Sequence, residues 1–220
     1  MGTITRSFAN NLTTNGILKA NAFNNASLNN VTALNVAIAT GNMVLLSSQT
    51  ASNSASISFT TGIDSTYKEY QFWFININRT GGSTSDFAFQ GSTDGGSNYN
   101  VTITSTFFDA YNFESVASSA LRYLTDRDLA QSTSFQPLSV NTSNNNADGG
   151  MSGILTIFNP SSTTYVKHFL GSIQTASSGD FSDNSYPAGY FNTTSAINAF
   201  QFKMGSGNIG DGTILLFGIK

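Results

Sequence analysis

Strict alternation of apolar and polar residues is the feature that most constrains how this chain can fold. From about residue 42 onward, short runs place apolar side chains at every second position, and the clearest run is 54–60. Successive side chains of a β-strand point to opposite faces, so this period predicts half-buried strands, with Ala55, Ile57 and Phe59 facing inward. No segment shows a helical period with capping residues. The alternation therefore predicts an all-β domain.

One further run is apolar on both faces and is expected in the middle of a sheet. Its two faces carry Tyr70, Phe72 and Phe74, and Trp73, Ile75 and Ile77. The other predicted strands are Met43–Ser48, Asp86–Gln90, Asn98–Phe108, Ser152–Phe158, Tyr165–Gly171, Ala199–Met204 and Thr213–Ile219. Short polar turns rich in Gly, Asn and Asp separate them, which predicts a jelly-roll-like two-sheet β-sandwich, with a closed barrel as the alternative. The longest break, 109–139, could hold a short helix or cover one end of the sandwich.

The first 41 residues have a different pattern and predict an extended Asn-rich arm in front of a sandwich domain at 42–220. Between residues 22 and 36, three blocks of five place Asn at the fourth position and a small apolar residue at the fifth. This period fits a coiled β path that sister chains or a neighbouring protein would stabilise, and a flexible arm is the alternative. The arm residues that we expect to act in anchoring and oligomerisation are Phe23, Leu28, Val31, Leu34 and Val36.

Charge is scarce along the whole chain. Charged residues make up 10% of it, and the nine basic residues are scattered, for a net charge of -3. Ordinary soluble domains carry roughly 25% charged residues. We therefore expect no nucleic-acid partner, because no basic patch is available. The 18 Phe and 8 Tyr supply enough apolar surface for a core, which argues against disorder.

The chain also lacks the sequence features of disulfide-bonded or thiolate-metal proteins and of membrane-spanning or secreted proteins. Without cysteine it can form neither disulfides nor a thiolate metal site. No run approaches the ~20 apolar residues of a membrane span, and the first residues lack the apolar stretch of a secretory signal. We therefore expect no membrane contact and synthesis in a cytoplasm without Sec export.

Groups that could carry catalysis are few. The single histidine, His168, alternates with its neighbours so that it faces solvent or a subunit boundary, and no Gly-x-Ser-x-Gly motif accompanies it. Paired carboxylates for glycoside hydrolysis are the other enzymatic possibility, and Asp126 and Asp128 around Arg127 are the closest pair. A solvated loop with local ion pairing explains that pair better. We therefore predict no catalytic residue.

The remaining motifs favour turns and contacts over bound cofactors. Residues 144–149 match the first half of a calcium loop, but Leu155 stands at the twelfth position, where a bidentate Glu is required. We therefore predict no metal and no cofactor. Tyr186, Tyr190 and Phe191 lie in a Pro-Gly segment that is less readily assigned to a strand. They are possible surface contacts, either as a sugar-stacking platform or, more economically, between subunits.

Several spaced segments of the sandwich resemble a family of virion proteins from tailed bacteriophages, notably phages of aquatic bacteria. The segments are Ser92–Thr102, Leu129–Leu138, Leu155–Thr163 and Gly207–Ile219. The resemblance covers roughly residues 42–220. Members of this family look like capsid decoration proteins, head fibres or tail-fibre tips, and the resemblance carries over no catalytic residue.

The resemblance implies a non-enzymatic capsid decoration or cement protein on the virion exterior, made in the cytoplasm of a bacterial host. Its partners would be itself, as a homotrimer by analogy, and the major capsid protein or other virion proteins. The alternative is a tail-fibre or tail-spike tip that binds a host-surface glycan. A polysaccharide-cleaving enzyme that uses Asp126 or Asp128 ranks below both.

Overall fold

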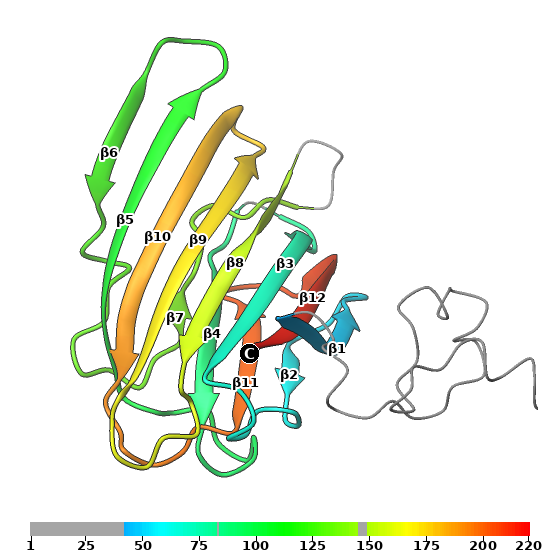
Figure 1. The fold of residues 1–220 in the computed structure, drawn as a ribbon. Coiled ribbons are helices and arrows are strands. Elements are labelled where there is room, and N and C mark those ends of the chain that lie inside the picture. The colour runs from blue at the N-terminus through cyan, green and yellow to red at the C-terminus, as the bar shows by residue number, and fades with distance from the viewer. Residues whose placement is uncertain (1–41, 83, 145–148) are drawn as a thin grey trace, which may run out of the picture. The chain divides into compact units, whose positions relative to one another are not determined.

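The computed structural model describes residues 42–82, 84–144 and 149–220, and its regular elements are all β-strands (Figure 1). In chain order they are β1 (Met43–Thr50), β2 (Ile57–Phe59), β3 (Glu69–Arg79), β4 (Phe87–Ser92), β5 (Ile103–Phe113), β6 (Ser119–Tyr123), β7 (Gln136–Pro137), β8 (Gly150–Phe158), β9 (Lys167–Ser177), β10 (Phe181–Phe191), β11 (Ala199–Met204) and β12 (Ile209–Ile219). The predicted all-β class is confirmed. Within these ranges there is no helix long and apolar enough to cross a membrane.

The predicted arm falls outside this description. Phe23, Leu28, Val31, Leu34 and Val36 all lie before residue 42, where the described residues begin. Their role in assembly therefore stays a prediction.

The strands form two antiparallel sheets that pack as a sandwich. The larger sheet has the order β1-β12-β3-β8-β9-β10-β5-β6, and the smaller has the order β2-β11-β4-β7. Figure 1 shows the smaller sheet behind the larger one. Without β5, β6, β9 and β10, the two sheets read β1-β12-β3-β8 and β2-β11-β4-β7, which is the strand order of a jelly roll built from two Greek keys. The predicted jelly-roll-like sandwich is confirmed, and the closed barrel is wrong because the strands divide into two separate sheets.

Two inserted hairpins widen one sheet of this jelly roll. Strands β9 and β10 follow β8, while β5 and β6 fall between β4 and β7, yet the two hairpins join in space. Strands β10 and β5 pair along their whole lengths, from Phe181 opposite Phe113 to Phe191 opposite Ile103. The larger sheet therefore extends well beyond the four strands that the jelly roll requires.

Phenylalanine rings fill the space between the sheets. Phe72 and Phe74 of β3 are buried against Phe202 of β11, with ring centroids 4.9 and 5.3 Å from that ring. Phe202 also contacts the rings of Phe59, Phe87 and Phe89. Buried aromatic side chains of this size contribute on the order of 2–3 kcal/mol each. The burial of Tyr70, Phe72 and Phe74 confirms the predicted inward face of β3.

The predicted outward face of β3 needs one correction. The alternation places Ile77 with Trp73 and Ile75, but Ile77 is fully buried. The register of β3 against β8 shifts between Phe74 and Ile77, and Asn76 has a left-handed φ of 50°. This bulge adds a residue to the strand and turns Ile77 back into the core.

Other strand predictions were displaced or incomplete. Ala55, predicted to face inward, is exposed before β2 begins at Ile57. Strand β5 begins five residues later than the predicted strand and runs on to Phe113. The long break does not hold a helix, because 109–113 continue β5 and the rest of it contains β6 and β7. Strand β10 was not predicted.

Candidate functional site

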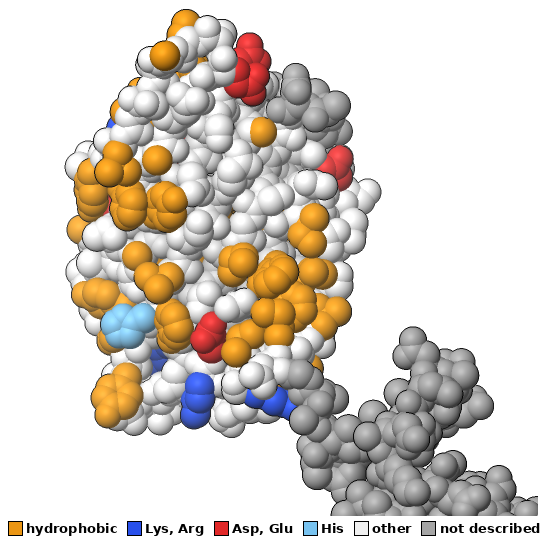
Figure 2. All heavy atoms as spheres, turned by 45° about the horizontal axis from the view of Figure 1, so that its top comes forward, with side chains coloured by type: hydrophobic (Ala, Val, Ile, Leu, Met, Phe, Trp, Pro, Cys, Tyr) orange, Lys and Arg blue, Asp and Glu red, His pale blue; other side chains and the backbone are white. Residues whose placement is uncertain are grey.

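The outer face of the larger sheet, turned away from the smaller sheet, carries most of the exposed apolar surface. Among the described residues, ten large apolar side chains are exposed, and all except Val116 and Tyr165, which lie in connecting segments, point outward from the strands of this face. These residues are Met43, Leu45, Ile75, Phe108, Leu121, Tyr123, Ile154 and Leu170. Figure 2 shows hydrophobic side chains gathered in groups across it, with few charged ones between them. Exposed patches of this kind mark interaction sites.

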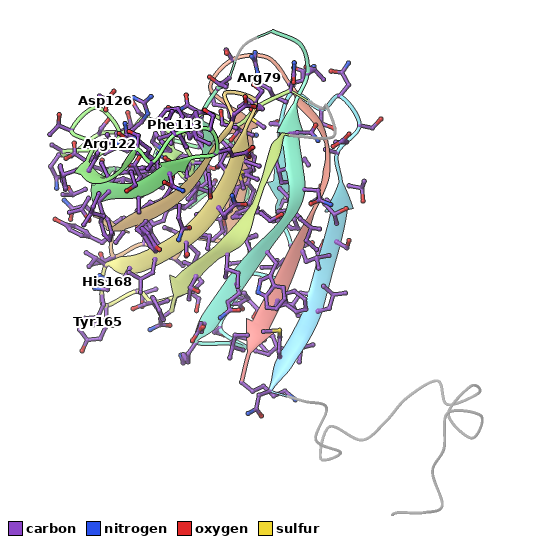
Figure 3. The ribbon with its side chains drawn as sticks, turned by 90° about the horizontal axis from the view of Figure 1, so that it is seen from above. Arg79, Phe113, Arg122, Asp126, Tyr165 and His168 are labelled. Carbon is purple, nitrogen blue, oxygen red and sulfur yellow. The ribbon has the colours of Figure 1, made fainter. Side chains whose placement is uncertain are left out.

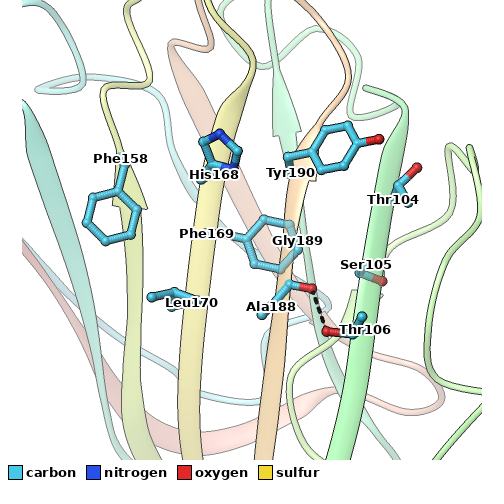
Figure 4. A pocket seen from close by; sticks show the side chains of 10 residues that line it. All are labelled: Thr104, Ser105, Thr106, Phe158, His168, Phe169, Leu170, Ala188, Gly189 and Tyr190. Atoms are coloured by element: carbon cyan, nitrogen blue, oxygen red, sulfur yellow. Dashed lines mark hydrogen bonds between the residues drawn. The ribbon is translucent and has the colours of Figure 1, made fainter.

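A shallow groove of about 390 Å³ lies on the outer face over β8, β9, β10 and β5 (Figure 4). Two rows of side chains that cross the strands line it. One row contains His168, Tyr190 and Thr104, and the other contains Leu170, Ala188 and Thr106. The groove is mostly apolar and has a volume within the range of small-ligand sites.

Glycine at position 189 shapes the strands beneath this groove. A Cβ atom there would lie 2.5 Å from the carbonyl oxygen of Thr104 and 2.8 Å from Cζ of the core residue Phe169. Only glycine therefore fits between the Phe169 ring and strand β5. The Pro-Gly composition that obscured β10 in the sequence follows from this close packing.

His168 and Tyr190 are the polar aromatic residues of the groove, and the hydroxyl groups of Thr104 and Thr106 lie beside them. Their ring centroids lie 6.2 Å apart on neighbouring strands, and His168 is exposed, as the alternation predicts. Figure 3 shows His168 and Tyr165 on the same side of the sheet. Within the described part of the chain, neither His168 nor Tyr190 makes a side-chain hydrogen bond. Both rings are therefore available to a ligand or a partner.

The three predicted surface contacts of β10, Tyr186, Tyr190 and Phe191, do not form one site. Tyr190 lines the groove, whereas Tyr186 stacks on Phe108 with the ring centroids 4.9 Å apart. Phe191 is fully buried and packs against Phe169 and Phe200. Its assignment as a surface contact is wrong, because alternation along β10 turns it inward while Tyr190 faces outward.

An acidic pair that the sequence did not indicate lies inside the sandwich. Asp109 of β5 and Asp183 of β10 are both fully buried beside Arg122 of the edge strand β6. Arg122 makes a bidentate pair with Asp109, in which Nε donates to Oδ1 at 3.0 Å, and its Nη2 lies 3.7 Å from Oδ2 of Asp183. Ser185 donates a hydrogen bond to Asp183 at 3.0 Å. The guanidinium also covers the ring of Tyr111 at 4.3 Å.

Burial favours the protonated form of Asp183. Desolvation raises the pKa of Asp183 to about 7, and the hydrogen bond and charge of Asp109 add to the shift, while Ser185 and Arg122 oppose it. Two carboxylates beside one guanidinium cannot both ionise without cost. Because both groups are covered, the arrangement suits a clasp that joins β5, β10 and β6 rather than substrate chemistry. The alternation Ile103, Ser105, Phe107 could have revealed Asp109 as the next inward residue.

The carboxylates considered for glycoside hydrolysis are held by other contacts. Asp126 pairs with Arg127, whose Nε lies 2.6 Å from Asp86, and Asp128 accepts a hydrogen bond from the Tyr123 hydroxyl at 2.7 Å. This is the local pairing that the sequence favours. Figure 3 shows Asp126 and Arg122 at the β6 end of the larger sheet.

The candidate metal ligands give no site within the described residues. No group of three or more His, Asp or Glu side chains comes together there. Residues 145–148 of the calcium-like stretch lie outside the described ranges. Lys167 is buried, its Nζ donates to the carbonyl oxygen of Thr193 at 3.0 Å, and desolvation lowers its pKa.

The described residues therefore present a broad apolar outer face that carries a groove and, separately, a covered acidic clasp. Comparison of the chain with protein-family models, with curated proteins and with solved structures found no match.

Proposed function

We propose that the chain is a non-enzymatic structural protein of a tailed-bacteriophage virion, a capsid decoration or cement protein that exposes its jelly-roll domain on the particle. The observation that carries the proposal is the widened larger sheet with its nearly uncharged apolar outer face. Jelly rolls are a common architecture of viral capsid and lectin domains. A knob of this kind adheres through shape and apolar contact rather than through charge.

The segments that resemble phage virion proteins form much of the frame of this domain. Residues 92–102 form the connection from β4 to β5, in which Asp94 accepts a hydrogen bond from the Asn98 amide nitrogen at 2.9 Å. Residues 207–219 include the whole of β12, which pairs with β1 and β3. The resemblance therefore concerns the framework of the domain, as a structural role requires.

In this proposal residues 1–41 anchor the protein to the major capsid protein or another virion protein and help to form a homotrimer. The test is deletion of residues 1–40 followed by incubation with undecorated particles. We expect a truncated protein that gives a β-type circular dichroism spectrum but no longer joins particles. Decoration by the truncated protein would show that the anchor lies in 42–220. Imaging of labelled particles would place the protein on the capsid or on the tail.

The groove favours a second candidate function, a tail-fibre or tail-spike tip that binds a host-surface glycan. His168 and Tyr190 offer ring faces and polar atoms to a sugar, and no Asp, Glu, Lys or Arg lines the groove. A neutral saccharide would fit such a lining. The test is binding of the full chain to a glycan array and to host envelope fractions. Tyr190→Ala should abolish binding, while Tyr186→Ala is the matched control because Tyr186 does not line the groove.

A further inference from the structure

We propose that the outer face of the larger sheet is covered by another copy of the same chain. The inference goes beyond the virion role and needs no phage particle for its test. It rests on the extent of the face, its lack of charge and the position of its exposed side chains.

The face is large enough for a stable interface. It spans eight strands, and neighbouring strands lie about 4.8 Å apart. Along β3 its outward positions run from Glu69 to Ile75, a length of about 20 Å. The projected area is therefore on the order of 700 Å², close to the roughly 800 Å² per partner of a stable protein interface.

Charge is nearly absent from this area. Between the cross-strand row of Glu69 and that of Ile75, the outward positions of the described strands carry only Glu69 and His168 as acidic or basic side chains. Glu69 lies opposite Phe158 of β8, and the register of β8 against β9 places Phe158 in the same cross-strand row as His168. The side chains of Glu69 and His168 therefore both lie in the row at one margin of the face. An identical face therefore meets little like-charge repulsion when it packs on this one.

The apolar side chains are spread over the face in a way that favours a protein over a sugar. The exposed ones come from both edge strands, with Leu45 on β1 and Leu121 on β6, and from strands between them. A saccharide would engage the groove alone and leave most of these side chains in water. Every copy carries the same neutral face, so a closed symmetric assembly buries it on all subunits at once.

The chain contains a built-in reporter of this contact. Trp73, its only tryptophan, lies on the outer face of β3 with its ring 5.3 Å from that of Phe217, and its indole nitrogen donates to Gln71 at 3.0 Å. A second copy packed on the face would shield this indole from water. Its emission wavelength and its quenching by acrylamide therefore report on coverage of the face.

The experiment compares the full-length chain with Leu45→Glu and Leu170→Glu by sedimentation and by Trp73 fluorescence. Both leucines are 54% exposed, so the substitutions leave the core intact. Val116→Glu is the matched control, because this side chain is 58% exposed and lies in the turn between β5 and β6 rather than on the strands of the face. Leu170 lies two strands from β3, so its substitution changes Trp73 emission through loss of the partner rather than by direct contact.

We expect wild type and the control to sediment as a multiple of 23.3 kDa, with shielded Trp73. The two leucine variants should sediment at the mass of one chain, or acrylamide should quench their Trp73 fluorescence with a severalfold larger quenching constant. An unchanged mass with a newly exposed Trp73 in Leu170→Glu also supports the proposal, since it shows that the face was covered. A wild-type monomer at tens of micromolar, including one that binds saccharide, would overturn it. So would leucine variants that match the control in both mass and quenching.

Discussion

Asp109 and Asp183 share one guanidinium. They lie on neighbouring strands, β5 and β10, both carboxyl groups are fully buried, and Arg122 of β6 bonds the first and lies 3.7 Å from the second. Strand β6 is the edge of the larger sheet, and four of its five residues are exposed. The attachment of this edge therefore depends on the charge state of a covered pair.

Stability should fall as the pH rises through neutrality. The pKa of Asp183 is raised to about 7 in the folded chain, mainly by burial. Between about pH 4 and pH 7 the folded state holds a proton that the unfolded chain has released, so each rise in pH lowers the free energy of unfolding. The loss is at most about 4 kcal/mol over this window. Urea unfolding at a series of pH values measures it.

Asp183→Asn tests the cause of this slope. Asparagine stays neutral, so the variant should lose much less stability between pH 5 and pH 8 than wild type. Some slope remains, because burial also raises the pKa of Asp86. Asp94, whose pKa is lowered to about 2 chiefly by the Ser92 hydroxyl, loses its contribution only at lower pH. Asp126→Asn is the control, since its side chain is 70% exposed, and a slope equal to that of wild type in Asp183→Asn would contradict the assignment.

Removing the guanidinium of Arg122 should lower the free energy of unfolding most at high pH. Arg122→Met leaves the buried carboxylate of Asp109 without its bidentate partner, which costs about 3 kcal/mol at pH 8. The cost should shrink near pH 5, where Asp183 holds its proton and only one buried carboxylate is left without the guanidinium. The double variant Asp109→Asn with Arg122→Met should be more stable than the sum of the two single changes predicts. Additive effects in that cycle would show that the pair does not act as a unit.

The strands of the jelly-roll core could be predicted from the sequence because the alternation that marks them lies within each strand. Tyr70, Phe72 and Phe74 alternate with polar or outward residues, and the predicted strand 199–204 has the bounds of β11. A two-residue period of this kind depends only on the strand's own side chains and on one dry face. It needs no knowledge of the strand's partners.

Neither Asp183 of the acidic clasp nor the groove could be predicted in this way, although the alternation along β5 indicates Asp109. Inward positions of β10 hold Asp183, Ser185 and Pro187, a run without the large apolar side chains that mark a buried face. They are buried because β5 and β9 pair on either side, and those pairings join distant parts of the chain. His168 and Tyr190 become neighbours through the same register. Similarly, the bulge at Asn76 reverses the orientation of Ile77, although β3 contains no glycine or proline that would indicate a bulge.

Phe202 should be among the most sensitive core positions. Its ring contacts five others, drawn from both sheets. Phe202→Ala leaves a cavity between the sheets and should lower the free energy of unfolding by about 3–5 kcal/mol. Phe108→Ala is the matched control, since Phe108 is exposed on the outer face, and it should cost much less. Chemical denaturation of both variants at one pH gives the comparison, and similar costs would contradict the placement of Phe202.

Gly212 should be the least replaceable glycine of β12, because it lies against the bulge that buries Ile77. Its φ is +106°, and a Cβ atom would meet the carbonyl oxygen of Asn76 at 2.5 Å and Cα of Ile77 at 2.8 Å. Both neighbours are backbone atoms that cannot move without disrupting the pairing of β12 with β3. Gly212→Ala should therefore cost more than the ~1–2 kcal/mol of left-handed strain alone. Gly81→Ala isolates that strain, since Gly81 has a φ of +62° and open space where its Cβ would lie. Thermal unfolding of the two variants separates clash from strain, and equal melting temperatures would show that β12 can shift at this position to admit a side chain.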